Sequence, residues 1–419
     1  MQYRTFGKLD WKPSALGFGA MRLPVIDNDA GKIDEEEATR MVRYAIDQGV
    51  NYVDTAYPYH RETCEAFLGR ALQDGYRQRV RMATKLPCWL VKEADDFDRY
   101  LDEQLQKLQA DYIDFYLLHG LGEDSWPKVR DLGVLTWAER ALADGRIGHL
   151  GFSFHDRVEV FEEIVDATDL WTLCQIQYNL VDTMHQAGTR GLQYAASKGL
   201  AVVVMEPLRG GALARNIPPA VQALWDSYTP HPSPPSLRSG LNDGLPEGEG
   251  VMPLSLRERG GGEGRTPADW ALQWVWNQPE VSLVLSGMTT MEQLVENIAI
   301  ADRSKPGILT AEQLALIDRV REAYRAISPV PCTSCGYCMP CSSGVEIPRI
   351  FELYSDAIMY DDPVTTRFLY RGPTVLKPEQ RADQCIECGE CMKACPQNIA
   401  IPEQLQKAHA LLGPRKQSA

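Results

Sequence analysis

The chain has 419 residues and a hydrophobic fraction of 44%, which is typical of a globular protein with a large core. Its formal net charge of −14 repels phosphate backbones and anionic lipid surfaces, so we expect no nucleic-acid or membrane partner. No apolar run is long enough to cross a bilayer, and residues 1–19 lack the features of a secretory signal. We therefore expect a cytoplasmic protein.

Short apolar segments alternate with longer amphipathic ones up to about residue 325. A short hairpin with a turn near Gly7 is expected first, at residues 2–16, where it could close the N-terminal end of a barrel. Each apolar segment is rich in Val, Ile, Leu or aromatic residues and is short enough for a buried parallel strand. The expected strands are 15–19, 51–56, 81–86, 112–119, 147–154, 173–179, 200–207 and 281–287.

The amphipathic segments between them predict helices. Residues 34–49 show the pattern well, with Asp34 as an N-cap and Gly49 at the end. Further helices are expected at 94–109, 134–144, 156–167, 187–198, 267–278 and 290–302. Eight strands that alternate with helices predict an α/β protein with a (β/α)8 TIM barrel over residues 1–325. An open doubly wound sheet is the alternative, but no G-x-G-x-x-G motif follows the first strand.

One segment of the barrel region, 228–267, is dense in Pro and Gly and poor in residues that are usually buried. Such a composition does not offset the entropy lost on ordering, so it predicts a flexible insertion. The insertion would follow the seventh strand, on the face where barrel active sites form. It is either a tolerated insertion or a lid over a cofactor.

Four titratable residues are expected at the ends of consecutive strands: Asp54, Tyr59, Lys85 and His119. Each has a structural explanation alone, although an unpaired buried lysine is costly. Together they suit carbonyl reduction, which needs a proton donor at the oxygen. Lys85 would lower the pKa of Tyr59, Asp54 would hold Lys85 charged, and His119 would orient the carbonyl or relay a proton.

This order of residues, with D-x4-Y after the second strand, resembles the catalytic tetrad of the aldo/keto reductase superfamily. The resemblance covers residues 1–325. It implies an NAD(P)H-dependent oxidoreductase that reduces an aldehyde or ketone to an alcohol, with Tyr59 as general acid. The expected partner is therefore a small-molecule carbonyl substrate.

The resemblance also implies a dinucleotide site along the later strands. The residues it assigns to the nicotinamide are Ser153, Gln177 and Met205; those along the pyrophosphate are Leu208 and Gly210; those at the adenosine end are Gly287, Thr289, Gln293, Glu296 and Asn297. Phe154 replaces the usual Asn of the family, and Gln293 replaces an arginine that many NADP-preferring members carry. NADPH is the expected cofactor, and NADH is the alternative.

Eight cysteines lie between residues 332 and 395 in two groups, which in a reducing cytosol indicates metal binding rather than disulfides. The second group, C-x2-C-x2-C-x3-C-P, is the ligand run of bacterial ferredoxins. We expect a ferredoxin-like iron–sulfur module over 326–419 with two [4Fe–4S] clusters, and a zinc site of four cysteines is the alternative for the first group. By the ferredoxin rule, one cluster takes Cys332, Cys335, Cys338 and Cys395, and the other takes Cys341, Cys385, Cys388 and Cys391.

The two parts differ in the number of electrons that they move. A nicotinamide transfers a hydride, whereas a cluster moves single electrons, and no flavin fingerprint links the two. We therefore expect a complete hydride enzyme with an accessory module that is structural, redox-regulatory or a docking point for an electron-transfer protein. The alternatives are a nicotinamide-binding redox sensor and a cluster-based electron-transfer protein that uses the barrel as a scaffold.

Overall fold

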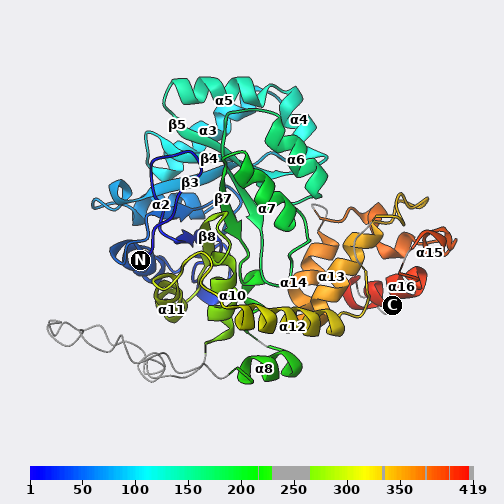
Figure 1. Cartoon of the computed structure of the whole chain (residues 1–419). Coiled ribbons are helices and arrows are strands. Elements are labelled where there is room, and N and C mark those ends of the chain that lie inside the picture. The colour runs from blue at the N-terminus through cyan, green and yellow to red at the C-terminus, as the bar shows by residue number, and fades with distance from the viewer. Residues whose placement is uncertain (216, 229–264, 333–335, 373–374, 396, 415–419) are drawn as a thin grey trace. The chain divides into compact units, whose positions relative to one another are not determined.

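The computed structural model (Figure 1) describes residues 1–215, 217–228, 265–332, 336–372, 375–395 and 397–414. The chain divides into two compact units, Met1–Gly210 with Pro230–Ala311 and Gly211–Thr229 with Glu312–Ala419. The boundary expected near residue 325 stays a prediction. The expected insertion at 228–267 lies, from 229 to 264, outside the described residues.

The first unit is built on a closed barrel of parallel strands, as predicted. Neighbouring strands follow chain order, and β1 pairs with both β2 and β8 to close the barrel. The strands are β1 (Leu16–Gly19), β2 (Tyr52–Asp54), β3 (Arg81–Leu86), β4 (Ile113–Leu121), β5 (Ile147–Phe154), β6 (Trp171–Gln177), β7 (Ala201–Met205) and β8 (Val281–Gly287).

Apolar side chains fill the inside of this barrel. The buried cluster comprises Phe6, Tyr52, Ala83, Phe115, Leu117, Leu173, Ala201, Val203, Leu283 and Leu285. Phe6 comes from the N-terminal segment, where an antiparallel bridge to Leu9 forms the expected tight turn at Gly7. Side chains alternate between the two faces of a strand, so a residue two positions after an inward-facing residue also faces inward. Asp54, Lys85 and His119 each follow a residue of this cluster by two positions, and they therefore face the C-terminal end of the barrel interior.

Helices surround the strands of this unit (Figure 1). Helix α1 begins after Asp34, whose Oδ1 accepts a hydrogen bond of 3.2 Å from the backbone N–H of Glu37. The helices are α1 (Glu35–Asp47), α2 (Cys64–Ala71), α3 (Asp95–Leu108), α4 (Ser125–Asp131), α5 (Val134–Ala143), α6 (Val158–Asp166), α7 (Gly188–Ser197), α10 (Pro267–Trp276) and α11 (Met291–Ala301). The sequence analysis missed α2 and α4, which are too short to show a clear helical period.

The second unit is helical. Its helices are α8 (Pro219–Asp226), α12 (Ala311–Ile327), α13 (Ile347–Met359), α14 (Pro363–Arg371), α15 (Glu390–Ala394) and α16 (Ile401–Leu412). Helices α13, α14 and α16 pack on one another around a core that includes Phe351, Tyr370 and Leu405. Cysteines of both sequence groups pack against this core.

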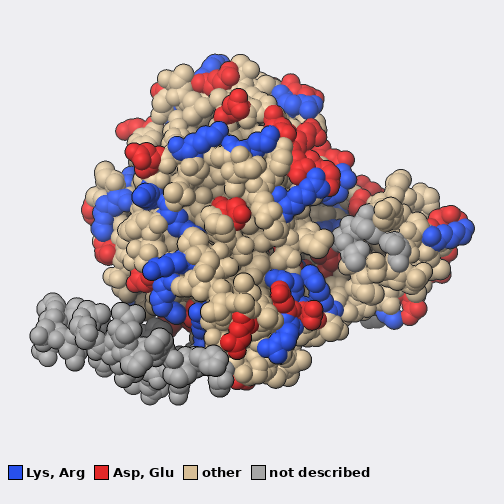
Figure 2. All heavy atoms as spheres, viewed as in Figure 1, with Lys and Arg blue, Asp and Glu red and all other residues tan. Residues whose placement is uncertain are grey.

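Charged side chains of both signs are distributed over the face drawn in Figure 2. Many form ion pairs, such as Arg70 with Glu35 at 2.6 Å and Arg190 with Glu162 at 2.6 Å. Exposed pairs of this kind contribute little to stability. No helix in the described part of the chain is both long and apolar enough to span a bilayer.

Candidate functional site

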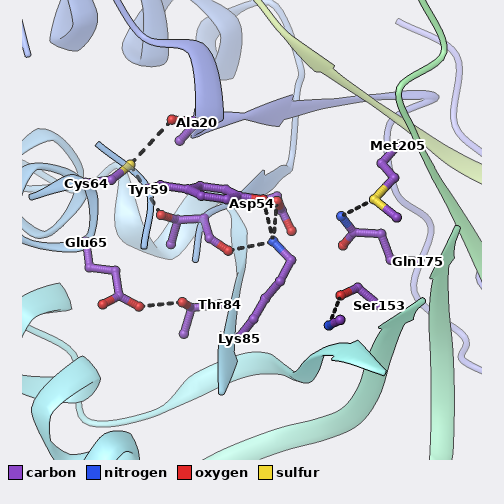
Figure 3. A network of polar contacts seen from close by, with 12 residues as sticks. Ala20, Asp54, Tyr59, Cys64, Glu65, Thr84, Lys85, Ser153, Gln175 and Met205 are labelled. Carbon is purple, nitrogen blue, oxygen red and sulfur yellow. Dashed lines mark hydrogen bonds and ion pairs between the residues drawn. The ribbon is translucent and has the colours of Figure 1, made fainter. Parts of the chain in front are cut away.

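The ends of β2 and β3 bring three of the four tetrad residues into contact (Figure 3). The Lys85 Nζ donates to Asp54 Oδ1 at 2.7 Å, to the Thr55 carbonyl at 2.7 Å and to the Tyr59 hydroxyl at 3.4 Å. Lys85 and Asp54 are almost fully buried. An ammonium only donates, so the Tyr59 oxygen must accept, and the phenolic hydrogen is left for another acceptor.

Burial and charge act against each other in this group. Burial lowers the pKa of Lys85, but Asp54 and Tyr59 more than reverse this effect, so the ammonium stays charged. For Tyr59, burial raises the pKa and Lys85 lowers it, and burial prevails. Lys85 thus lowers the pKa of Tyr59 as expected, but burial outweighs this effect and the net shift is upward.

His119, the fourth tetrad residue, lies beside the tyrosine. Its ring centroid is 6.2 Å from that of Tyr59 and 5.1 Å from that of Trp89. Burial, followed by the positive charges of Lys85 and His155, lowers the pKa of His119 well below its usual value. The imidazole is thus neutral, and its buried Nδ1 has no hydrogen-bond partner among the described residues. A ring nitrogen in this state can bond to a polar group of a ligand.

Polar side chains of β5 and β6 face the same interior (Figure 3). Ser153 on β5 is the register neighbour of Gln175 on β6, and its Oγ accepts from the Gly120 N–H at 2.8 Å. The Gln175 Nε2 lies 3.7 Å from the sulfur of Met205, and its Oε1 is buried with no partner in the described structure. The Ser153 hydroxyl hydrogen and the Gln175 carbonyl are therefore available to a ligand.

Gln177 is the predicted carboxamide contact, and its neighbour Gln175 on β6 was not part of that prediction. Gln177 donates to Asp182 Oδ2 at 3.3 Å, and the same carboxylate accepts from Asn179 at 2.9 Å and pairs with Arg209. The amide of Gln177 thus bonds to the loop after β6, whereas the Oε1 of Gln175 has no partner among the described residues. Both glutamines lie on the inward face of β6, so the alternation of strand residues could have identified either one.

The loops after β7 and β8 meet near Arg22, which directly follows β1. A Cβ at Gly210 would lie 2.8 Å from Arg22 Nη2, and the stem of Arg22 lies against Gly287. The Thr289 hydroxyl donates to the Arg22 carbonyl at 3.0 Å, and the Thr289 N–H donates to Gln293 Oε1 at 2.8 Å. The guanidinium of Arg22 therefore lies beside the loops after β7 and β8. No motif around Arg22 in the sequence predicts this position.

The remaining predicted cofactor residues bond mainly within the protein. Asn297 is buried and donates to the Ser286 hydroxyl at 3.0 Å, which ties α11 to the end of β8. Glu296 accepts from the Thr266 hydroxyl at 2.9 Å. Leu208 is half-buried in the loop after β7. Their roles as cofactor contacts stay predictions.

Comparisons with known proteins identify both parts of the chain. The aldo/keto reductase family model matches residues 15–322. The chain belongs to the aldo/keto reductase family. A 4Fe-4S dicluster domain model matches residues 331–400, so this reductase-family chain carries a C-terminal 4Fe-4S domain, as predicted.

Relatives of this aldo/keto reductase differ in their described roles. An L-galactose dehydrogenase of Arabidopsis thaliana is 25% identical over 338 residues, which are 78% of this chain and 97% of that protein. A probable voltage-gated potassium channel subunit beta of Oryza sativa subsp. japonica is 26% identical over 320 residues, covering 72% and 92%. The structure of a Klebsiella pneumoniae aldo-keto reductase in complex with NADPH has a TM-score of 0.56 at 22% identity, covering 77% and 96%.

Cys341, Cys385, Cys388, Cys391 and Cys395 of the C-terminal domain form no disulfide with a described residue. One cavity of this domain is lined by Cys332, Cys338 and Cys395, with apolar walls that include Ile347 and Phe351. The fourth predicted ligand of this set, Cys335, is not among the described residues. The cavity thus joins cysteines of the first sequence group to the last cysteine of the second.

The other predicted ligand set also comes together. Burial, and then the nearby Cys385, Cys388 and Cys341 thiols, raise the pKa of Cys391. Ser342, the neighbour of Cys341, has its Oγ 3.9 Å from Cys388 Sγ. The helical unit therefore places one cysteine of the first group among three of the second, a donor set that suits an iron–sulfur cluster. Within the described residues, no group of three or more His, Cys, Asp or Glu side chains has the geometry of a metal-ion site.

Proposed function

We propose that this protein is an NAD(P)H-dependent reductase that converts an aldehyde or ketone to an alcohol, with Tyr59 as general acid. The observation that carries the proposal is the contact of Lys85 with both Asp54 and Tyr59. Lys85 donates to the Tyr59 oxygen, so the phenolic proton is left for a substrate oxygen. The raised pKa of Tyr59 keeps that proton in place at neutral pH.

The other polar groups would position the reactants. When bound, the nicotinamide supplies a hydride to the carbonyl carbon. The unpaired Gln175 Oε1 and the Ser153 hydroxyl suit the donors and acceptors of a carboxamide. The unpaired nitrogen of His119 would bond to the substrate oxygen beside Tyr59. Residues that hold reactants in line in this way lower the entropic part of the barrier.

We favour NADPH over NADH as the cofactor. The family resemblance points to NADPH, and the similar Klebsiella pneumoniae protein binds it. Arg22 lies between the loops that carry Gly210 and Thr289, where its charge would attract phosphate groups. Gln293 carries no charge for a 2′-phosphate, so NADH is the cofactor that a direct comparison has to exclude.

For the C-terminal domain we propose two [4Fe–4S] clusters with crossed ligand sets. The support is the proximity of Cys395 to the first cysteine group and of Cys341 to the second. We infer that the domain is accessory to hydride transfer, in a role that is structural, redox-regulatory or the docking of an electron-transfer protein. Iron and sulfide analysis distinguishes these clusters from a zinc site.

The test of the proposed function is anaerobic oxidation of NADPH and of NADH with a panel of aldehydes and ketones. Turnover that depends on Tyr59 supports a hydride-transfer reductase. Tight cofactor binding without turnover on any carbonyl favours the redox sensor instead. Activity that needs a partner protein and survives loss of Tyr59 favours the electron-transfer alternative.

The pH dependence of the reaction follows from the same groups. Because burial raises the pKa of Tyr59 above its usual value of about 10, the acid form persists through the neutral range. We expect kcat/KM for carbonyl reduction to stay level from about pH 7 to 9 and to fall only at higher pH. A fall with a midpoint near about pH 7 to 8 would mean that the charge of Lys85 prevails over burial.

Replacing Gln175 by leucine tests which of the two glutamines of β6 contacts the cofactor. We expect Gln175→Leu to raise the KM for the cofactor roughly three- to tenfold, since one hydrogen bond to the carboxamide is lost. The matched control, Gln177→Leu, should change KM less than about twofold, because Asp182 keeps its other partners. Steady-state kinetics measures both, and a larger effect at Gln177 would support the sequence-based assignment instead.

A further inference from the structure

A second cavity, of about 420 Å³, lies at the N-terminal ends of the barrel strands. It is lined at the start of β3 by Arg81 and at the start of β5 by His149, with Trp11 from the N-terminal segment. Arg81 begins the strand that carries Lys85 near its other end, four residues or about 13 Å away. The cavity is therefore separate from the candidate active site.

Arg81 brings a positive charge to this cavity, and no carboxylate of the described residues forms an ion pair with it. Its guanidinium lies 4.6 Å above the ring of Trp11 and 5.9 Å from that of Phe115. No hydrogen bond or ion pair from this side chain to another described residue is present. By contrast, Arg77 pairs with Asp114 at 2.8 Å and Arg79 pairs with Asp47 at 2.7 Å on the same rim.

His149 adds a second open polar group. Its ring stacks on Phe115 at 5.2 Å with an interplanar angle of 25°, and neither ring nitrogen bonds to a residue that the structure describes. Burial and the charge of Arg81 lower its pKa, and Asp114 acts in the opposite direction. The Asp114 Oδ2 is already engaged by Arg77 and, at 3.0 Å, by the Met82 N–H. Arg81 therefore offers N–H donors to the cavity, and the neutral imidazole of His149 offers one N–H donor and one acceptor nitrogen.

We propose that this cavity binds a small organic anion through a phosphate or carboxylate group held by Arg81 and His149. The guanidinium presents several N–H donors in a fork that fits either group. The protein has a net charge of −14. An arginine such as Arg81, which has no ion-pair partner among the described residues, is therefore less expected here than on a basic protein and points more strongly to an anionic ligand. The cavity volume suits a small molecule rather than a macromolecule.

The test uses the full-length cluster-loaded protein saturated with NADP⁺, which keeps added anions out of the dinucleotide site. Isothermal titration with inorganic phosphate, and separately with succinate, measures binding. We expect saturable binding of at least one probe, and Arg81→Gln should weaken it about tenfold or more. The stronger of the two probes identifies the anionic group.

The matched control is Arg79→Gln, which removes a rim arginine that Asp47 already pairs with. It should change the affinity by less than about twofold. If Arg81→Gln fails to fold, as judged by its melting curve, His149→Gln replaces it, and a severalfold loss is expected. The absence of saturable binding, or equal effects of Arg81→Gln and Arg79→Gln, would overturn the proposal.

Discussion

Replacing Tyr59 by phenylalanine is expected to lower kcat for carbonyl reduction by about 10²- to 10⁴-fold, the usual contribution of a general acid. The change removes only the hydroxyl that Lys85 contacts at 3.4 Å and leaves the ring in place. The KM for the carbonyl should change much less, because the lost interaction acts mainly in the transition state. Anaerobic steady-state kinetics with NADPH measures both quantities.

Tyr57→Phe is the matched control for this variant. Tyr57 lies on the same loop, but its ring stacks edge-on against Tyr100 at 5.3 Å and contacts Lys107 rather than Lys85. Its hydroxyl is not part of the tetrad, so kcat should stay within about twofold of the wild type. Equal rates for Tyr59→Phe and the wild type would rule out Tyr59 as the general acid.

Replacing Cys391 by serine is expected to remove one of the two proposed clusters and to leave the other. Iron content should fall to about half of the wild-type value, because each [4Fe–4S] cluster holds four irons. The control, Cys64→Ser, changes a buried barrel thiol that lies 3.3 Å from the Thr55 hydroxyl. That variant should keep its full iron content in the same iron and sulfide assay.

A double variant decides whether the ligand sets are crossed. Cys341 and Cys391 lie together in the structure although they belong to different sequence groups. If they ligate one cluster, the double serine variant should keep about half of its iron, like the single variant. Loss of nearly all the iron would instead mean that each sequence group binds its own cluster.

Much of the barrel could be predicted from local patterns. Apolar segments of strand length, such as 81–86, alternate with amphipathic helices, and Asp34 caps α1 as its position indicates. Because the ends of parallel barrel strands converge on one face, the order of Asp54, Lys85 and His119 along the chain was enough to place them together. The short helices α2 and α4 escaped prediction since a segment of seven or eight residues shows little more than two turns.

The (β/α)8 class, the grouping of Asp54, Tyr59, Lys85 and His119, and the two cysteine groups could thus be predicted from the amino-acid sequence, because each depends on residue type and spacing along the chain. Features that depend on burial and on contacts between distant segments became visible only in the folded chain. Burial, which no spacing reveals, turned the pKa of Tyr59 upward despite Lys85. Likewise, the alternation of side chains along a strand places Gln175 and Gln177 on one face of β6. Only the surrounding contacts show that Gln177 bonds to Asp182, whereas the amide oxygen of Gln175 has no hydrogen-bond partner among the described residues.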